Sequence, residues 1–267
     1  MNPYTLPDRN VHIAFSGGRT SAYMLHQILE ANGGLPDRVR VVFANTGREM
    51  PETLDFVQEC GSRWGVPIVW VQYIPVDPWF EVVSHNSAAR DGEPFEAMIR
   101  HKRYIPNGRK RICTDQLKVR TAKRMLVAEG WKSWVKALGI RADEPDRHDM
   151  PDQPRERIWM PIVDAGVTRD VVMRFWRGQP FDLPAGTVSN CRLCFQFQRA
   201  KLAFQMLNDP KDDWPERMEA IGLGTFLGDR PWREFRAAVE AQGDLLIDWK
   251  EPARSPCGAA MDGECVG

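Results

Sequence analysis

The sequence predicts an α/β protein built on a twisted parallel sheet flanked by helices, and three observations support this class. Short apolar runs at residues 11–15, 39–44 and 67–71 have the length of buried strands. Segments with apolar residues at helical spacing separate these runs, and such alternation is typical of a parallel sheet with right-handed crossovers. Polar turns containing glycine follow the first two strands, at the edge where such sheets bind ligands.

The composition is that of a globular protein with one large domain, or one domain and an appendage. The chain has 267 residues, of which 43% are hydrophobic and 27% are charged. We expect a cytoplasmic protein without a membrane partner, because no N-terminal apolar core and no membrane-length apolar run occurs. Six cysteines in such a chain indicate metal binding, redox chemistry or catalysis more than disulfides. The oligomeric state stays open.

The first strand leads directly into a helix through a short polar loop. The strand at residues 11–15 is followed by Ser16-Gly17-Gly18-Arg19-Thr20-Ser21, and apolar residues at helical spacing begin at Tyr23. Glycines leave backbone N–H groups open, and the first helical turn adds unpaired donors and a positive dipole end. We therefore expect these six residues to bind a phosphate. The alternative is an ordinary turn with a Ser or Thr helix cap.

The other elements follow in order along the chain. The second strand ends at Asn45-Thr46-Gly47, and Pro51 opens a helix that runs to residue 64. Residues 74–111 lack a regular pattern, and we expect a mobile or substrate-covering segment there. The remaining predictions are helices at 116–128, 168–177, 192–207, 216–221 and 232–241, strands at 134–138 and 158–163, and a flexible tail at 252–267.

Positive charge gathers in one segment of a chain whose formal net charge is zero. Residues 90–124 hold eleven Lys or Arg and four acidic residues, a balance of +7. A solvated face is the ordinary explanation of such a run. Because Cys113 lies within it, we also expect an anionic substrate there. The candidate anion-binding residues are Arg109, Lys110, Arg111 and Lys118.

The sequence of this loop matches neither of two common phosphate-binding motifs but resembles a third. Neither GxxxxGK(S/T) nor GxGxxG occurs at this junction. The pattern resembles the SGGxxS loop of the PP-loop family, which contains the ATP pyrophosphatases and the phosphoadenosine phosphosulfate (PAPS) reductases. Many pyrophosphatases carry Asp where this chain has Thr20. The loop therefore predicts nucleotide binding more strongly than magnesium-assisted cleavage of ATP.

Three later segments resemble PAPS reductases. They are FANTGREMPETLDFV, KALGIRADE and WMPIVDAGVTRDVVMRFW, and with the first loop they extend over residues 11–183. The resemblance implies an adenine-nucleotide alpha-hydrolase-like (Rossmann-like) fold, with a PP-loop nucleotide-binding domain at residues 1–183. Residues 184–267 would form a helical C-terminal appendage that carries cysteines.

The resemblance also implies roles for residues beyond the loop. Arg141, after Gly139, would contact a sulfate or phosphate group in catalysis, because guanidinium geometry suits bidentate oxyanion binding. Its alternative is a surface ion pair with Asp143 or Glu144. Asn45, Thr46 and Gly47 would flank the adenosine; their alternative is a simple turn.

The cysteines form a second constellation. Cys191-Arg192-Leu193-Cys194 is a C-x-x-C placed before a predicted helix, which suits metal chelation or thiol exchange and favours thiolates. Adenylylsulfate reductases bind a 4Fe-4S cluster through a Cys-Cys pair and a distant C-x-x-C. By this resemblance Cys113, Cys191 and Cys194 would be ligands. A fourth ligand would come from Cys257 or Cys265, or the fourth iron would stay open to a small ligand, since Ile112 stands where the pair's other cysteine is expected. Zinc and no metal are the alternatives.

The last cysteine lies in Glu264-Cys265-Val266-Gly267. This segment resembles the Glu-Cys-Gly motif that carries the nucleophile on the mobile tail of these reductases, although Val266 replaces glycine. Cys265 is therefore the candidate catalytic nucleophile. A metal ligand and an inert tail residue are its alternatives. Cys60 lies within an apolar helix, where we expect it to be a packing residue.

These observations lead to three functional hypotheses. The first is a PAPS or adenylylsulfate reductase-like enzyme whose thiolate attacks activated sulfate and is then reduced by a thiol carrier protein. The second is an ATP-dependent, pyrophosphatase-type sulfurtransferase, assisted by Mg, that modifies a nucleic acid through the basic segment. The third is a non-catalytic module that senses nucleotide or redox state. All three bind an adenine nucleotide.

Overall fold

The computed structural model describes residues 2–184 and 190–242 and contains a six-stranded sheet in the order β4-β3-β2-β1-β5-β6. All neighbouring strands are parallel except β4, which runs antiparallel to β3 at one edge. The predicted α/β class with a parallel sheet is confirmed. The strands are β1 (Val11–Ala14), β2 (Val39–Asn45), β3 (Ile68–Gln72), β4 (Glu81–Val83), β5 (Trp134–Ala137) and β6 (Glu156–Trp159).

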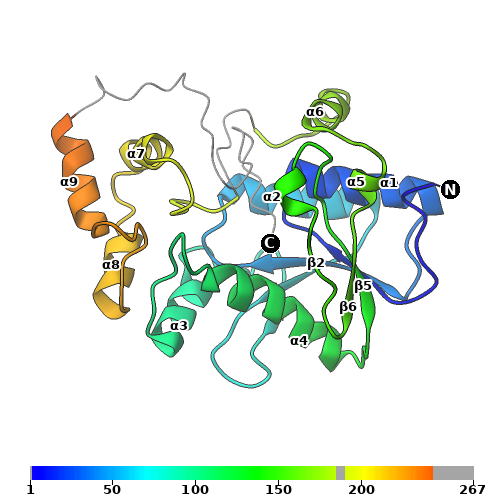
Figure 1. Ribbon diagram of the computed structural model, residues 1–267, viewed down its shortest axis with the longest axis horizontal. Helices are drawn as coiled ribbons and strands as arrows, with labels where there is room; N and C mark the ends of the chain where they lie inside the picture. Colours follow the sequence, from blue (N-terminus) through cyan, green and yellow to red (C-terminus); the bar gives the residue numbers. More distant parts are fainter. Residues whose placement is uncertain (1, 185–189, 243–267) are drawn as a thin grey trace.

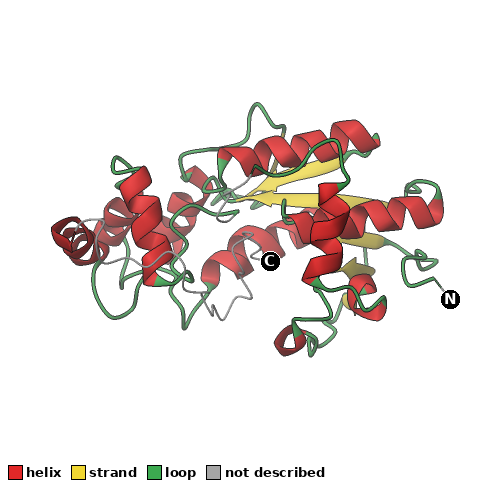
Figure 2. Cartoon of the chain, turned by 90° about the horizontal axis from the view of Figure 1, so that it is seen from above, coloured by secondary structure: helices red, strands yellow, loops and turns green. Residues whose placement is uncertain are grey.

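Helices cover both faces of the sheet (Figures 1 and 2). The first face packs against α1 (Arg19–Asn32), α2 (Pro51–Trp64) and α6 (Arg169–Arg177), and the opposite face packs against α4 (Arg120–Ala128). Successive strand residues point to opposite faces, so Val11, Ile13 and Phe15 enter the core under α1 and α2. His12 and Ala14 point toward the α4 side.

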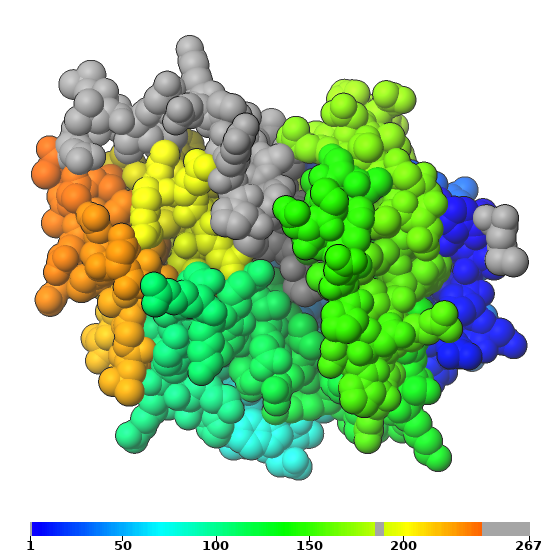
Figure 3. Space-filling model, viewed as in Figure 1, coloured from blue at the N-terminus to red at the C-terminus, as the bar shows by residue number. Residues whose placement is uncertain are grey.

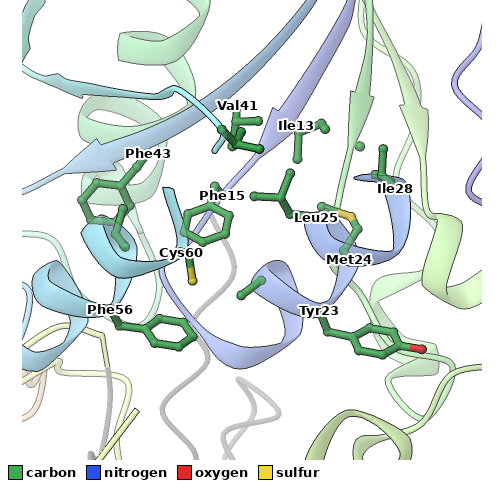
Figure 4. Close-up of a cluster of buried hydrophobic side chains, with 14 of the residues drawn as sticks. Ile13, Phe15, Tyr23, Met24, Leu25, Ile28, Val41, Phe43, Phe56 and Cys60 are labelled. Atoms are coloured by element: carbon green, nitrogen blue, oxygen red, sulfur yellow. The ribbon is translucent and has the colours of Figure 1, made fainter. Parts of the chain in front are cut away.

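Figure 4 shows the main core from within. Side chains of β1 and β2 meet the buried faces of α1 and α2, where apolar residues recur at helical spacing. Cys60 is fully buried there, which confirms its prediction as a packing residue. The labelled members are Ile13, Phe15, Tyr23, Met24, Leu25, Ile28, Val41, Phe43, Phe56 and Cys60.

A second apolar core joins the middle of the chain to its C-terminal helices. It combines α3 (Glu93–Lys102) with α7 (Arg199–Asn208), α8 (Trp214–Ile221) and α9 (Trp232–Gln242). Figure 3 shows the green surface of the middle segment adjoining the yellow and orange surface of these helices. The division of the chain after residue 183 stays a prediction, and this core takes residues from both sides of it.

The structure corrects the expectation that residues 74–111 are irregular. They contain β4 and α3, and α3 begins with Pro94 in its first turn and buries Phe95, Met98 and Ile99. The spacing of these three residues is helical. Charged residues between them hide the pattern in the sequence, and packing against the C-terminal helices stabilises it.

Three predicted boundaries were wrong. The strand expected at 158–163 ends at Trp159, and the short helix α5 (Pro161–Asp164) follows, because Pro161 suits a first helical turn. The helix expected from residue 192 begins at Arg199, and Leu193 has a positive φ of 50°. The helix expected from 116 begins as a π-helical turn, η1 (Thr114–Val119), before α4. A 3-10 turn, η2 (Pro145–Arg147), follows β5.

No helix in the described part of the chain combines the length and the apolar character that a membrane span requires.

Candidate functional site

The loop between β1 and α1 requires glycine at its centre. Gly17 has φ +81°, and a Cβ atom there would lie 2.8 Å from Thr53 Cγ2 and 3.0 Å from Val57 Cγ2. Gly18 is the extended N-cap residue of α1, and its carbonyl oxygen accepts the Ala22 N–H at 3.0 Å. The chain therefore turns tightly against α2 and enters α1 without an intervening residue.

Ser21 holds the loop in this shape. Its hydroxyl accepts the backbone N–H of Ser16 at 3.2 Å and the Ser16 hydroxyl at 2.9 Å, and donates to the Gly18 carbonyl at 2.9 Å. The first turn of α1 holds no acidic residue. The helix dipole at this end is therefore available to an anion.

The Arg19 side chain, predicted to bind the nucleotide, forms its contacts within the protein. Its guanidinium forms a fork with both Asp182 carboxylate oxygens, at 2.7 and 3.0 Å, and donates to the Leu183 carbonyl at 2.6 Å. Arg19 is buried, and its carbonyl accepts the Trp176 indole N–H at 2.9 Å. Arg19 thus joins the segment that follows α6 to the loop, and its side-chain donors are used within the protein.

The turn after β2 is bonded within the protein. Asn45 donates to Gln72 Oε1 and to the Ala89 carbonyl, both at 2.9 Å. The Thr46 N–H and hydroxyl both bond the Glu49 carboxylate at 2.9 Å. Gly47, with φ +77°, lies so close to the start of α3 that a Cβ would meet Pro94 Cδ at 2.9 Å. These contacts explain why Asn, Thr and Gly occur in this turn. Contact of the turn with adenosine stays a prediction.

The β5 turn brings Arg141 to the first turn of α1. A Cβ on Gly139 would lie 3.1 Å from Ser21 Cα, and the Arg141 guanidinium donates to Thr20 Oγ1 at 3.3 Å. Arg141 also pairs with Asp143 at 3.0 Å and lies 3.7 Å from Glu144. The ion pair considered as the alternative is therefore present, but Arg141 is buried in it and lies beside the loop.

Asp143 connects this arginine to the start of α6. Its carboxylate accepts the Arg169 N–H at 3.2 Å. Burial acts to raise the pKa of Asp143, but the hydrogen bonds from Arg169 and Arg141 outweigh it, and the pKa lies below its usual value. The carboxylate therefore stays charged and holds Arg141 in place.

The segment before the C-x-x-C is tied to the phosphate loop by Asn190. The Asn190 side-chain amide donates to the Ser16 carbonyl at 2.9 Å, and its own carbonyl accepts the Met50 N–H at 2.9 Å. Cys191 then forms a β-bridge with Glu49. Sequence reasoning missed Asn190; its position directly before the C-x-x-C was the only local signal.

The half-buried Cys191 thiol lies near charged side chains of both signs and near the Cys113 thiol. Burial and the neighbouring Glu49 raise the pKa of Cys191 to about 12, against the opposing influence of Lys118 and Arg48, and Cys113 raises it further. Burial also raises the pKa of Cys113, with Lys118 and Arg111 opposing. The placement at a helix N-terminus, which would favour thiolates, is not found, because α7 begins at Arg199 and the C-x-x-C lies in the turn before it.

The metal centre predicted from the cysteines stays a prediction. Within the described part of the chain, no group of three or more Cys, His, Asp or Glu is arranged to hold a metal ion. The described residues alone therefore supply no complete ligand set for a 4Fe-4S cluster or a four-cysteine zinc site. Cys257 and Cys265 lie outside the described residues.

Of the four predicted anion-binding residues, Lys118 lies at the loop. It lines a small cavity together with Ser16. Arg109 and Lys110 are exposed, and Lys110 stacks over the Tyr104 ring at 4.9 Å. Arg111 lies at the start of η1, where its charge acts on Cys113. The structure thus brings together the loop, Arg141, Lys118 and the Cys191 turn, and leaves Arg109 and Lys110 on the surface.

A parallel sheet with a glycine-containing loop after its first strand, leading directly into a helix, is typical of nucleotide-binding α/β proteins. The model of the phosphoadenosine phosphosulfate reductase domain matches residues 10–157, more than half of the chain. The protein belongs to the phosphoadenosine phosphosulfate reductase family.

Two similar proteins extend this comparison. The uncharacterized nin region protein ORF290 of Escherichia phage lambda is 31% identical over 203 residues, which are 71% of this chain and 67% of the phage protein. The crystal structure of PAPS reductase from Candida auris, a phosphate complex, is 16% identical with a TM-score of 0.41. That match covers 66% of this chain and 79% of the fungal chain.

Proposed function

We propose that this protein is a PAPS or adenylylsulfate reductase-like enzyme that binds an adenine nucleotide and performs thiol-dependent sulfur chemistry. The observation that supports the proposal is the glycine loop at the start of α1, which the hydrogen bond from Asn190 to the Ser16 carbonyl joins to the C-x-x-C turn. Family membership supports the same class of reaction.

The phosphate end of the nucleotide binds the backbone donors of the loop at residues 16–21. Gly18 is the residue that admits a ligand to the first turn of α1, since it has no side chain. Arg141 and Lys118 neutralise the oxyanion and the leaving group. Gly18→Leu is expected to abolish nucleotide binding while the circular dichroism spectrum stays that of the wild type; normal binding by this variant would overturn the assignment of the loop.

The reductive step transfers the sulfur group to a thiolate, for which Cys265 is the candidate. The thiolate attacks the sulfur of the activated sulfate, the sulfur–oxygen bond to the phosphate breaks, and the nucleoside phosphate leaves with the bonding electron pair. A thiol carrier protein then attacks the cysteine sulfur, which releases sulfite and forms a disulfide. The two thiols supply both electrons. We place this chemistry in the cytoplasm, because it consumes reduced thiols.

A nucleotide screen tests the proposal. We expect PAPS or adenylylsulfate to raise the melting temperature of the full chain more than ATP does, and sulfite to appear when a reduced thiol carrier is added. Stabilisation by ATP with release of pyrophosphate would instead support the sulfurtransferase. Binding of any of the three nucleotides without turnover would support a nucleotide- or redox-sensing module.

The sulfurtransferase remains the second candidate because of the basic segment at residues 90–124. Besides its charge balance of +7, the segment carries cation–aromatic pairs, with Lys110 over Tyr104 and Arg124 over Trp79 at 5.3 Å. Basic residues interleaved with aromatic rings suit single-stranded nucleic acid. Salt-dependent binding of an RNA oligonucleotide that Arg124→Gln weakens would favour this candidate.

A further inference from the structure

A small cavity lies on the face of the sheet opposite α1. Its volume is about 50 Å³, and residues of β1, β2, β5, η1 and α4 line it. Small side chains make the space, since Ala14, Ala44 and Ala122 contribute to the wall. The polar lining consists of His12, Ser16, Lys118 and Lys136.

His12 and Lys136 form the buried floor of this cavity. They are register partners on β1 and β5, and 3% of His12 and 8% of Lys136 are exposed. His12 Nδ1 has no hydrogen-bond partner among the described residues. Burial and the neighbouring Lys136 lower the pKa of His12 to about 3, so its imidazole is neutral at physiological pH.

The positive charge around the cavity exceeds the negative charge packed against it. Burial lowers the pKa of Lys136, and nearby Glu156 opposes this effect. Glu156, however, accepts the Trp134 indole N–H at 3.2 Å and lies 3.8 Å from Lys123. Within the described ranges, Lys136 forms no ion pair closer than 4.0 Å. A buried ammonium without a partner is costly, and a bound anion would offset that cost.

The volume of the cavity limits the size of a ligand that it can hold. Because one water-sized group needs roughly 10–15 Å³ of such space, the cavity holds about three to five heavy atoms. A purine base, with about ten, is too large by the same measure. We propose that the cavity binds a small inorganic oxyanion of the sulfate, sulfite and phosphate class. Lys136 and Lys118 donate to it, and the neutral His12 ring borders it.

This site differs from the phosphate position of the loop. Phosphate at the loop would contact the N-terminus of α1, whereas the cavity lies under α4 on the other face of the sheet. Ser16 borders both positions. The inference does not depend on the proposed reductase reaction, although the sulfite released there belongs to the same class of anion.

Nuclear magnetic resonance of the full chain with ¹⁵N-labelled histidine tests the proposal. The chain has five histidines, so the His12 resonance can be assigned by comparison with His12→Gln. We expect titration with sulfate, sulfite or phosphate to shift this resonance with saturation. In Lys136→Met the affinity is expected to fall at least about tenfold, as for loss of a hydrogen bond to a charged group. Lys132→Met, at an exposed position, is the matched control and is expected to bind as the wild type does.

A second variant keeps the test decisive if Lys136→Met does not fold. Ala122→Leu fills the cavity from α4 with a good helix former and is also expected to remove the shift. The absence of a saturable shift in the wild type, or unchanged affinity in Ala122→Leu, would show that the proposal is wrong. A shift of His12 by AMP and not by the inorganic anions would likewise overturn it, because the cavity would then be part of the nucleotide site.

Discussion

Replacement of Asn190 by Ala removes the contact that joins the C-x-x-C turn to the phosphate loop. Asn190 is 1% exposed, and its amide donates to the Ser16 carbonyl at 2.9 Å across 174 residues of sequence. The variant leaves that carbonyl without this donor, which costs about 1–3 kcal/mol of unfolding free energy. For a chain of this size each kcal/mol lowers the melting temperature by about 2–4 °C.

The same substitution is expected to change the site itself. Without the side-chain bond, the turn at Cys191 opens more often, so alkylation of Cys191 becomes faster and nucleotide affinity falls. Asn190→Asp is expected to be worse than Asn190→Ala, because a carboxylate facing the Ser16 carbonyl repels it. Thermal melting, mass spectrometry of the alkylated cysteine and nucleotide titration measure the three effects.

Asn208→Ala is the matched control for this prediction. Asn208 also donates its amide to a backbone carbonyl, that of Phe204 at 2.9 Å, but on an exposed helix surface away from the loop. We expect a change within about 0.5 kcal/mol and no effect on Cys191. If Asn190→Ala and Asn190→Asp matched Asn208→Ala in all three measurements, the tie between the turn and the loop would have no functional role.

Three other predictions concern the loop, the thiol and the tail. Gly17→Ala places a Cβ 2.8 Å from Thr53 Cγ2 at a φ of +81°. We expect the free energy of unfolding in urea to fall by about 1–3 kcal/mol and nucleotide binding to be lost. Gly108→Ala, whose Cβ would meet open space, is the control and is expected to change neither. Because the pKa of Cys191 is raised to about 12, we expect its thiol to alkylate slowly at pH 8. The unfolded thiol ionises near about 8.5, so the free energy of unfolding is expected to fall as the pH rises from about 8.5 to about 12. Alkylation at pH 8 as fast as in the unfolded chain would contradict this prediction. Truncation after Pro256 removes Cys257 and Cys265. Loss of turnover with unchanged metal content would indicate a nucleophile in the tail, and loss of both turnover and metal would indicate a metal ligand. If the truncated chain kept its turnover and its metal, both roles would be refuted.

Local signals in the sequence predicted most of the sheet domain. The strands β1, β2, β3 and β5 and the helices α2 and α6 lie within about two residues of their expected bounds, because short apolar runs and helix-start residues mark them directly. The helix α1 begins at Arg19, four residues before the expected helical spacing. The structure explains the SGGxxS pattern as well, since Gly17 has the positive φ and Ser21 the bonds that the loop needs.

The missed features depend on contacts between distant segments. α3 is charged and short, and its buried face exists only because the C-terminal helices pack against it. The β-bridge between Glu49 and Cys191, the bond from Asn190 to Ser16 and the fork between Arg19 and Asp182 each join residues more than 140 positions apart. No local periodicity in the sequence indicates such pairs. The sequence therefore predicted the C-x-x-C motif but not its surroundings or the raised pKa of Cys191.

The internal bonds of the loop determine which of its groups can bind a ligand. Arg19 is held by Asp182, Thr20 accepts from Arg141, and Ser16 and Ser21 bond each other. Because these side chains already have partners within the fold, the backbone N–H groups at the start of α1 are the donors left for a phosphate. Nucleotide affinity should therefore depend more on the two glycines, which keep those donors accessible, than on the charge of Arg19. Further hydrogen bonds connect the loop to α6 and to the segment before the C-x-x-C, so we expect a ligand that orders the loop to order these segments as well.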